Sequence, residues 1–323
     1  MKAAVVTGAG ERPVYMEFDA PRALPGHRLV DVAASALSRL AQGRAAGTHY
    51  SSSGRYPFVV GVVGVDGVGR TDDGRRVYFF GAPAPFGAMA ERTIVPDDRW
   101  VPLPDDLDDV SAAALAIPGM SSWAALTERA RLAAGETVLV NGATGTSGRL
   151  AVRIAKYLGA AKVIATGRDP AALDALLDAG ADAVVSLRQD DAELVRALEP
   201  HFRAGVDVVL DYLWGGSARA GLVAAANATD EGRRLRFVQI GSIGGADVSL
   251  PGAVLRATAI ELMGSGLGSV PMPRLLAAIR GVFDAAAPAA LSIDTRTVPL
   301  AAVGEHWADT DSRTRTVFVM RDR

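Results

Sequence analysis

Residues 137–148 read TVLVNGATGTSG, and this stretch decides the fold. Its first five residues are mostly apolar and β-branched, which is typical of a strand buried on both faces of a parallel sheet. Three glycines follow at intervals of three. From Arg149 to Leu158 apolar residues recur at helical spacing, and Gly159 ends the run. The order of strand, glycine turn and helix predicts the opening unit of an α/β nucleotide-binding fold.

The glycine turn indicates a dinucleotide site. Gly142 permits the tight turn, Gly145 lets the backbone approach a pyrophosphate, and Gly148 lets the helix pack close to the strand. The amides at the start of the helix, with the positive end of its dipole, then face the phosphates. The spacing is GxxGxxG rather than the commoner GxGxxG, so a glycine turn without a ligand is the alternative. The candidate residues of the turn are Gly142, Thr144, Gly145, Thr146, Ser147 and Gly148.

Length and composition narrow the class of protein. A chain of 323 residues exceeds one typical core, so we expect two domains. The net charge of −2 carries no basic excess, which argues against nucleic acid and anionic membranes as partners. No apolar run is expected to reach membrane-spanning length, and the first six residues resemble a strand rather than a signal peptide. The absence of cysteine excludes disulfides and thiolate metal sites, and predicts a cytoplasmic location.

The first 118 residues are predicted to be mostly β. Short apolar runs are separated there by glycine, proline and aspartate. A small apolar stretch, Ser111–Ile117, follows, and we expect Pro118–Gly119 to break it. The candidate strands are Val5–Thr7, Leu29–Ala34, Phe58–Val65, Arg76–Phe80 and Met89–Val95.

From residue 119 onward, strands and helices alternate. This alternation is the signature of a doubly wound parallel sheet. After the opening unit, the predicted strands are Lys162–Thr166, Asp182–Ser186, Val206–Leu210, Leu235–Ile240 and Ile260–Met263. The predicted helices are Pro170–Asp178, Asp190–Glu199, Ala218–Ala226 and Pro271–Ala286, and short β segments follow at Thr295–Pro299 and Thr316–Met320.

Two features point away from the short-chain reductases. Their glycine turn opens the chain, whereas here it begins near residue 142. They also need Tyr-x-x-x-Lys, and none of the six tyrosines has a lysine four residues later.

The chain instead resembles the medium-chain dehydrogenase/reductases, in their zinc-free, quinone oxidoreductase-like branch. Short matching segments run nearly from end to end, and it is their order and spacing together that make the resemblance specific. They are Met1–Lys2–Ala3, Pro57–Phe58–Val59–Val60–Gly61, Arg75–Arg76–Val77–Tyr78–Phe79, Pro118–Gly119–Met120–Ser121–Ser122–Trp123, the glycine turn, Leu158–Gly159–Ala160, Gly180–Ala181–Asp182, Asp207–Val208–Val209–Leu210–Asp211 and Ile240–Gly241–Ser242.

The resemblance implies an α/β protein in which a doubly wound Rossmann sheet is inserted in a β-rich, groES-like catalytic domain. The expected domains are 1–118 with 265–323 for the catalytic part, and 119–264 for the cofactor part. The resemblance places the active cleft at their junction. Dimers are usual in such proteins, so it also implies a homodimer.

Two departures from the family pattern concern the substrate side. The zinc enzymes hold their metal with a cysteine and a Gly-His-Glu segment, whereas the equivalent run here is taken as 61–65, Gly-Val-Val-Gly-Val. The four histidines show no metal-ligand spacing, so no metal site is expected. Quinone reductases commonly carry Asn-x-x-Asp, where this chain has Ser38–Arg39–Leu40–Ala41.

The end of the second Rossmann strand favours NADP(H). NAD enzymes place an acid there, whereas this chain has Gly167 and Arg168, and a guanidinium pairs well with a 2′-phosphate. The alternative for Arg168 is a plain surface cation. Asp169 follows at once and is interpreted as a helix cap, with ribose binding as the alternative. Lys156 and Arg188 are secondary phosphate candidates, with plain surface charge as the alternative.

Further cofactor contacts are carried over by position. In the family, backbone at Ile240, Gly241 and Ser242 meets the nicotinamide end, and the next glycine-containing contact corresponds to Gly264, Ser265 and Gly266. Asp211 lies on the same predicted sheet edge, either as a cofactor contact or as a group that orients its loop. Ser121 sits where a threonine often approaches the nicotinamide, with a helix cap as the alternative.

The expected reaction is hydride transfer from NADPH to a small molecule, a quinone or an α,β-unsaturated carbonyl, without a metal ion. A conjugated acceptor needs little polarisation, because one or two hydrogen-bond donors can stabilise the charge on its distal oxygen. Either water or a side chain would supply the proton. The candidate side chains are His49 and Tyr50, with His49 titrating near neutrality as a general acid or, as the alternative, simply exposed in its loop. The alternatives are reduction of one enone or iminium intermediate in a biosynthetic pathway, and NADPH binding without catalysis.

Overall fold

The computed structural model describes residues 1–8, 10–51, 61–309, 311 and 313–320. The chain divides into two compact units. Unit 1 contains Met1–Ile117, Leu275–Ala286 and Ser292–Arg323, and unit 2 contains Pro118–Arg274 and Ala287–Leu291. The domain limits expected from the sequence stay a prediction.

Unit 2 is built on a six-stranded sheet in the order β11-β10-β9-β12-β13-β14. Every neighbouring pair is parallel. The first strand of the unit, β9, lies third in the sheet, and the strand order reverses beside it. This is the doubly wound arrangement that the alternating pattern predicts. The strands are β9 (Thr137–Asn141), β10 (Lys162–Gly167), β11 (Ala183–Ser186), β12 (Val208–Asp211), β13 (Leu235–Gln239) and β14 (Ile260–Gly264).

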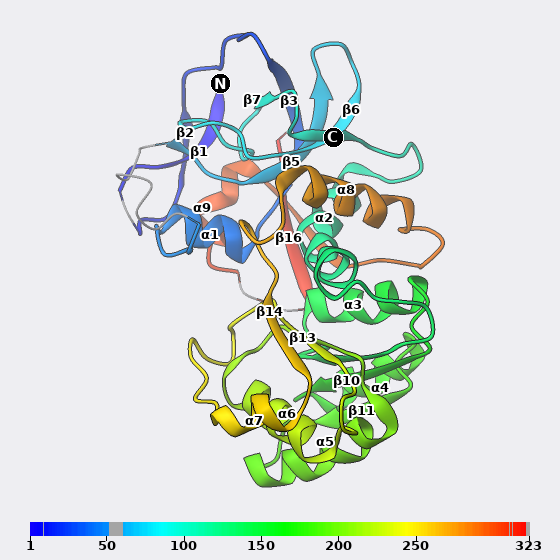
Figure 1. Ribbon diagram of the computed structural model, residues 1–323. Coiled ribbons are helices and arrows are strands. Elements are labelled where there is room, and N and C mark those ends of the chain that lie inside the picture. The colour runs from blue at the N-terminus through cyan, green and yellow to red at the C-terminus, as the bar shows by residue number, and fades with distance from the viewer. Residues whose placement is uncertain (9, 52–60, 310, 312, 321–323) are drawn as a thin grey trace. The chain divides into compact units, whose positions relative to one another are not determined.

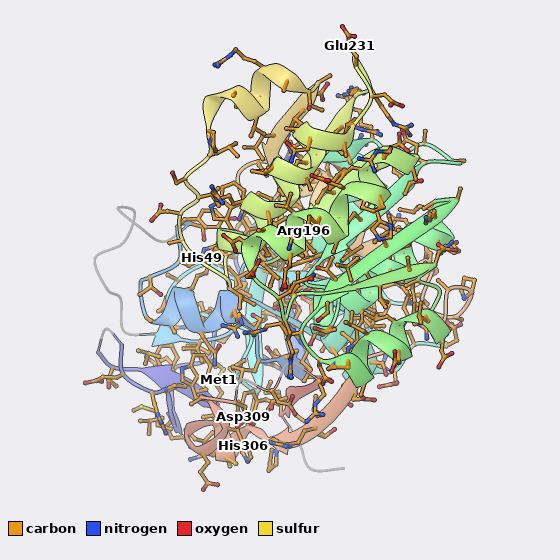
Figure 2. All side chains as sticks on the ribbon, turned by 90° about the horizontal axis from the view of Figure 1, so that it is seen from below. Met1, His49, Arg196, Glu231, His306 and Asp309 are labelled. Carbon is orange, nitrogen blue, oxygen red and sulfur yellow. The ribbon has the colours of Figure 1, made fainter. Side chains whose placement is uncertain are left out.

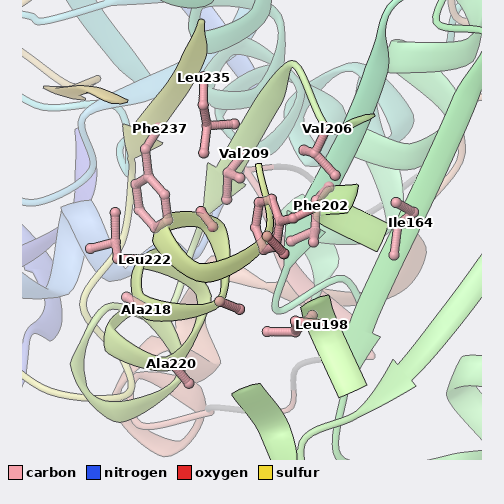
Figure 3. Close-up of a cluster of buried hydrophobic side chains, with 14 of the residues drawn as sticks. Ile164, Leu198, Phe202, Val206, Val209, Ala218, Ala220, Leu222, Leu235 and Phe237 are labelled. Atoms are coloured by element: carbon pink, nitrogen blue, oxygen red, sulfur yellow. The ribbon is translucent and has the colours of Figure 1, made fainter. Parts of the chain in front are cut away.

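Helices cover this sheet (Figure 1). Figure 3 shows Leu198 and Phe202 of α5 and Leu222 of α6 packed against Val209 and Phe237 of the strands. Because successive side chains of a strand point to opposite faces of the sheet, the remaining strand side chains lie on the other face. Helix α3 packs on β9 and β10. The helices are α3 (Thr146–Tyr157), α4 (Pro170–Asp178), α5 (Asp191–Gly205), α6 (Gly215–Ala228), α7 (Gly252–Ala257) and the π-helix η1 (Ala125–Ala130).

The expected break at Pro118 is wrong. Helix α2 (Asp109–Ala124) runs through this proline, and the division between the two units falls inside it. The five residues 112–116 are at most 1% exposed, so packing on all sides outweighs the hydrogen bond that proline removes. With η1, the helical stretch Asp109–Ala130 is also long and apolar enough to cross a membrane, contrary to expectation. Its apolar window is 67% buried inside the protein, as in the core helix of a soluble protein.

Unit 1 holds two sheets. The smaller has the order β2-β1-β4, and the larger has the order β15-β16-β3-β5-β6-β8, with β7 also paired to β3. Because β16 pairs with β3, both ends of the chain contribute to one sheet. The α/β class, with a parallel sheet between two β-rich chain segments, is confirmed. The strands are β1 (Lys2–Val6), β2 (Val14–Glu17), β3 (His27–Ala36), β4 (Gly61–Val62), β5 (Asp66–Thr71), β6 (Arg76–Phe80), β7 (Arg92–Pro96), β8 (Trp100–Pro102), β15 (Asp294–Pro299) and β16 (Thr314–Val319).

Short helices complete unit 1: α1 (Arg39–Ala45), α8 (Met272–Asp284, whose first three residues belong to unit 2), the 3-10 helix η2 (Leu300–Ala302) and α9 (Val303–His306). Several short elements were not expected from the sequence, among them β2, β5, β8 and α1 of unit 1 and α7 of unit 2. The first three residues of the predicted strand at 58–65 lie outside the described part of the chain.

Candidate functional site

The glycine turn joins β9 to α3 at the carboxyl edge of the parallel sheet. Gly142 has φ +90°, which disfavours any side chain. A Cβ atom there would also stand 2.8 Å from Leu213 Cγ. At Gly148 a Cβ atom would stand 2.6 Å from Ala143 Cα, so only glycine allows α3 to start this close to the turn. These two glycines shape the turn whether or not a ligand is present.

Gly145 differs from the other two glycines of the turn because the space beside it is open. A Cβ atom there would meet no atom closer than the Gly142 carbonyl oxygen at 3.8 Å. Gly145 is the N-cap of α3, and the amides of Ser147 and Gly148 in the first turn have no acceptor within the helix. Thr144 and Thr146 are half-buried on either side. An open backbone position beside first-turn amides fits a phosphate group.

Arg168 follows directly after β10, where the sequence predicts the 2′-phosphate contact. Its side chain is exposed and makes no hydrogen bond or ion pair with any described residue. Gly167 is buried, and a Cβ atom on it would collide with the Thr144 side chain. Asp169 caps α4, since its carboxylate accepts from the amide of Ala171 at 3.1 Å. Arg168 is therefore the cation at this strand end that remains available to a ligand.

The two secondary phosphate candidates differ. Lys156 Nζ is 2.7 Å from Asp182 Oδ2 and donates to the Ala161 carbonyl, so it is already engaged. Arg188 lies beyond β11 and is exposed.

The other predicted cofactor segments end at one edge of the sheet. The ladder pairs Asn141 with Asp211, Asp211 with Gln239, and Gln239 with Gly264. Ile240, Gly241 and Ser242 follow Gln239, and Ser265 and Gly266 follow Gly264, with the Ser265 amide donating to the Gln239 carbonyl at 2.8 Å. In doubly wound sheets, ligands bind along this edge.

Asp211 uses its carboxylate within the protein. It is fully buried, and its oxygens accept from the Asn141 amide at 2.8 Å and from the backbone amides of Leu213 and Trp214. Burial raises the pKa of Asp211 above its ordinary value. Of the two predicted roles, these bonds favour the orientation of its loop. Asn141, which sequence reasoning did not single out, is its side-chain partner.

Ser121 and Ser122 lie one turn past Pro118. The Ser121 hydroxyl donates to the Pro118 carbonyl at 2.8 Å, which satisfies an acceptor inside the helix. The Ser122 hydroxyl lies 2.7 Å from the Tyr212 hydroxyl and 3.1 Å from the Ser147 carbonyl. Ser122 therefore joins α2 to the start of α3 and to the residue after Asp211.

The predicted proton donors belong to unit 1. The Ser51 amide donates to His49 Nδ1 at 3.1 Å, which places the proton of the neutral ring on Nε2. Burial and the nearby Arg44 guanidinium hold the pKa of His49 below its ordinary value (His49 is labelled in Figure 2). The lowered pKa favours the neutral ring, whose Nε2–H is a hydrogen-bond donor, and the role of His49 as a general acid stays a prediction. The Tyr50 ring lies 4.2 Å from the His49 ring, and Tyr50 is 59% exposed.

At the position of the family's Asn-x-x-Asp, Ser38 is the N-cap of α1. Its hydroxyl accepts from the Ala41 amide at 3.0 Å. In the run taken as equivalent to the zinc ligands, Val62 and Val63 are buried core residues. Among the described residues, no group of three or more histidine, cysteine, aspartate or glutamate side chains is arranged to hold a metal ion.

Comparison with known proteins identifies the family. The family described as zinc-binding dehydrogenase matches residues 148–281. A protein of Emericella nidulans named "Probable NADPH-dependent quinone reductase" is 30% identical over 362 residues, which cover 99% of this chain and all of that protein. The chain belongs to the medium-chain dehydrogenase/reductase superfamily. Within it, the chain is a member of the quinone oxidoreductase-like branch.

Solved structures of this branch have the same fold. The quinone oxidoreductase of Thermus thermophilus, solved also in complex with NADPH, superposes with a TM-score of 0.79 at 25% identity, covering 99% of this chain and 100% of that one. A mycobacterial quinone oxidoreductase superposes with a TM-score of 0.84 at 21% identity, covering 99% of each chain.

A biosynthetic enzyme is also similar over part of the chain. A phenolphthiocerol/phthiocerol polyketide synthase of Mycobacterium tuberculosis is 36% identical over 178 residues. These cover 55% of this chain and 7% of that much longer protein.

Proposed function

We propose that this protein transfers hydride from NADPH to a quinone or an α,β-unsaturated carbonyl without a metal ion. As a member of its family it is an NADP-dependent oxidoreductase. On the cofactor side, the observation that carries the proposal is that the open Gly145 and the unengaged Arg168 both follow strands at the carboxyl edge of the parallel sheet. The full-length similarity to a protein named as an NADPH-dependent quinone reductase supports it.

The residues of unit 2 would bind and orient the cofactor. The amides of Ser147 and Gly148 would donate to the pyrophosphate, and the Arg168 guanidinium would pair with the 2′-phosphate. The segments 240–242 and 264–266 would contact the nicotinamide end along the same edge. When bound, NADPH supplies the hydride.

Hydrogen-bond donors are the proposed catalytic groups. The candidates that would donate to the oxygen gaining charge are the Nε2–H of His49 and the hydroxyl of Tyr50. Ser121 is a third candidate, whose hydroxyl would first have to leave the Pro118 carbonyl. Because the pKa of His49 is lowered, the residue acts in this proposal as a neutral donor. Absence of cysteine, and valines where the zinc enzymes would need ligands, argue that this chain itself offers no metal-assisted polarisation. A conjugated acceptor suits such a site, because its reduction needs only modest oxyanion stabilisation.

The test is NADPH oxidation with a panel of acceptors. Quinones and enones should be turned over after dialysis against a chelator, and simple ketones should not. Turnover of simple ketones alone, or loss of activity on chelation, would contradict the proposal.

A second candidate is the reduction of one enone intermediate in biosynthesis, which the likeness to a polyketide synthase favours. It predicts that small quinones are poor acceptors and that one unsaturated thioester or ketone is much better. Tight NADPH binding with no turnover of any acceptor would favour the third reading, a binding protein without catalysis.

We also propose a homodimer joined through β14, in the cytoplasm. This strand is one of the two edge strands of the parallel sheet, and Leu262 on it is 42% exposed. A second copy would pair with its open edge and cover Leu262. Leu262→Glu should yield a monomer by light scattering, whereas Leu177→Glu, which changes a similarly exposed leucine on α4, should not.

A further inference from the structure

A continuous line of hydrogen bonds crosses three neighbouring strand ends of the parallel sheet. The Gly142 amide donates to Thr166 Oγ1 at 3.2 Å, and the Thr166 hydroxyl donates to Asn141 Oδ1 at 2.8 Å. The Asn141 amide then donates to Asp211 Oδ1 at 2.8 Å. Each side chain has a defined donor or acceptor role, so the orientation of the Asn141 amide is fixed from both sides.

Asp211 extends this line to the predicted nicotinamide segment. Its carboxylate accepts from the amides of Leu213 and Trp214, and its backbone carbonyl accepts from the amides of Ile240 at 2.7 Å and Gly241 at 3.2 Å. Asp211 therefore holds two loops at once: the β12–α6 loop through its side chain, and the segment after β13 through its backbone.

The two loops are also in close contact with each other and with the glycine turn. Leu213 packs directly over Gly142, and a Cβ atom on Gly241 would stand 2.5 Å from the Tyr212 carbonyl oxygen. The Leu213 carbonyl accepts from the Gly244 amide at 2.7 Å. A shift of the β12–α6 loop would thus move both the glycine turn and the segment 240–244.

The backbone of the β12–α6 loop is strained where Asp211 holds it. Trp214 has φ +59° and ψ −157°, a conformation that non-glycine residues rarely adopt, and Gly215 follows with φ +62°. Such strain persists only where the surroundings impose it. The hydrogen bonds from the amides of Leu213 and Trp214 to the carboxylate are the constraint seen here.

We propose that Asn141 and Asp211 are positioning residues, which hold the pyrophosphate-binding turn and the nicotinamide-binding segment in register. The inference rests on the proposed function, because it concerns the same NADPH site. Neither side chain touches the cofactor in this account. Their effect is to make one preformed site out of two backbone segments that are about 100 residues apart in sequence.

The first test is Asn141→Leu, measured with two ligands. NADPH spans both segments, whereas adenosine 2′,5′-bisphosphate occupies only the adenosine end. The variant should bind NADPH about tenfold more weakly, as expected for loss of a buried hydrogen bond. Its dissociation constant for adenosine 2′,5′-bisphosphate should stay within about twofold of the wild-type value. Thr258→Val is the matched control, because Thr258 is similarly buried in unit 2 and its hydroxyl has no hydrogen-bond partner among the described residues.

The second test uses Asn141→Asp and compares the NADPH affinity of this one variant at different pH values. The carboxyl that this substitution introduces would, when protonated, still donate to Asp211 and accept from Thr166, whereas two ionised carboxylates would repel each other. In the wild-type protein the Asn141 side chain bonds one charged group, Asp211. The other partners of Asn141, Thr166 and Ser217, are neutral. NADPH affinity of the variant should fall about tenfold between about pH 6 and 9, beyond any change in wild type.

The outcomes separate the two claims. Equal weakening of both ligands in Asn141→Leu, unchanged NADPH affinity, or an Asn141→Asp variant whose pH dependence follows wild type would overturn the positioning role. Wild-type protein that binds neither ligand would overturn the proposed function, and the inference with it.

Discussion

Gly148 packs so closely on Ala143 that a Cβ atom would stand 2.6 Å from the Ala143 Cα atom, whereas Gly145, three residues earlier, borders open space. Two glycines of one turn therefore have different physical tasks. Gly148 allows the helix to pack, and Gly145 leaves room for a ligand.

This difference predicts opposite behaviour on substitution. Gly148→Ala should lower the free energy of unfolding by about 1–3 kcal/mol, because backbone atoms must move. Gly145→Ala should change it by less than about 1 kcal/mol, since its φ of −81° and ψ of 166° suit alanine, but should weaken NADPH binding about tenfold or more. Urea denaturation and NADPH titration of both variants check this. A Gly145→Ala protein with wild-type affinity would contradict the phosphate position.

Arg168 should determine the preference for NADPH. Arg168→Ala removes a charge-assisted pair with the 2′-phosphate, which corresponds to roughly a 10- to 100-fold rise in KM for NADPH. KM for NADH should stay within about threefold, because NADH lacks this phosphate. Arg196→Ala, which removes an exposed charge from α5 (Figure 2), is the control. Equal changes for both cofactors would show that Arg168 does not read the phosphate.

His49 should not titrate in the working range of the enzyme. Because its pKa lies below the ordinary value of 6.5, the neutral ring predominates above that pH. The pH profile of kcat between about pH 6.5 and 8.5 should therefore be the same in wild type and His49→Gln. A limb present in wild type and lost in the variant would show that His49 acts as a general acid.

Stability should depend on pH through Asp66 in unit 1. This carboxyl is 1% exposed, and burial raises its pKa to about 7, more than the Arg315 guanidinium and the Tyr78 hydroxyl lower it. The folded protein then binds more protons than the unfolded chain between about pH 4 and 7. Its free energy of unfolding should fall as the pH rises through this window, by on the order of 4 kcal/mol in total from this group.

Asp66→Asn is the corresponding variant. It should flatten this part of the stability curve, measured by denaturation at a series of pH values, whereas Asp98→Asn at an exposed position should not. Parallel curves for wild type and Asp66→Asn would contradict the assignment. The comparison concerns the slope, because the variant also removes the charge that faces Arg315.

The parallel sheet is predictable from the sequence because each of its strands is a local signal. Apolar runs such as Val208–Leu210 and caps such as Asp169–Pro170 carry their information within a few residues. The order of these signals indicates the doubly wound topology, and strand order in the structure agrees with it.

Where the prediction fails, contacts from distant segments outweigh local propensity. Gly67 and Gly69 suggest a turn, yet they lie in β5. Glycine is needed there for close packing, since a Cβ atom at Gly67 would stand 2.9 Å from Phe79 and one at Gly69 would stand 2.8 Å from Val30. Helix α5 likewise continues past Pro200, with Phe202 buried beyond it.

The site was predictable only in its backbone outline. The glycine turn is predicted from one strand–turn–helix unit, and Arg168 from its position directly after the next strand. The hydrogen bond between the Asn141 and Asp211 side chains joins residues 70 positions apart, so no local sequence pattern predicts it. The lowered pKa of His49 depends in the same way on burial and on Arg44, neither of which the sequence displays.

Titration calorimetry of the purified protein with NADPH is the decisive measurement for the proposed cofactor site. We expect saturable binding at one site per chain, about tenfold or more tighter than the binding of NADH under the same conditions. No saturable heat with either NADPH or NADP+, in a protein shown to be folded, would contradict it.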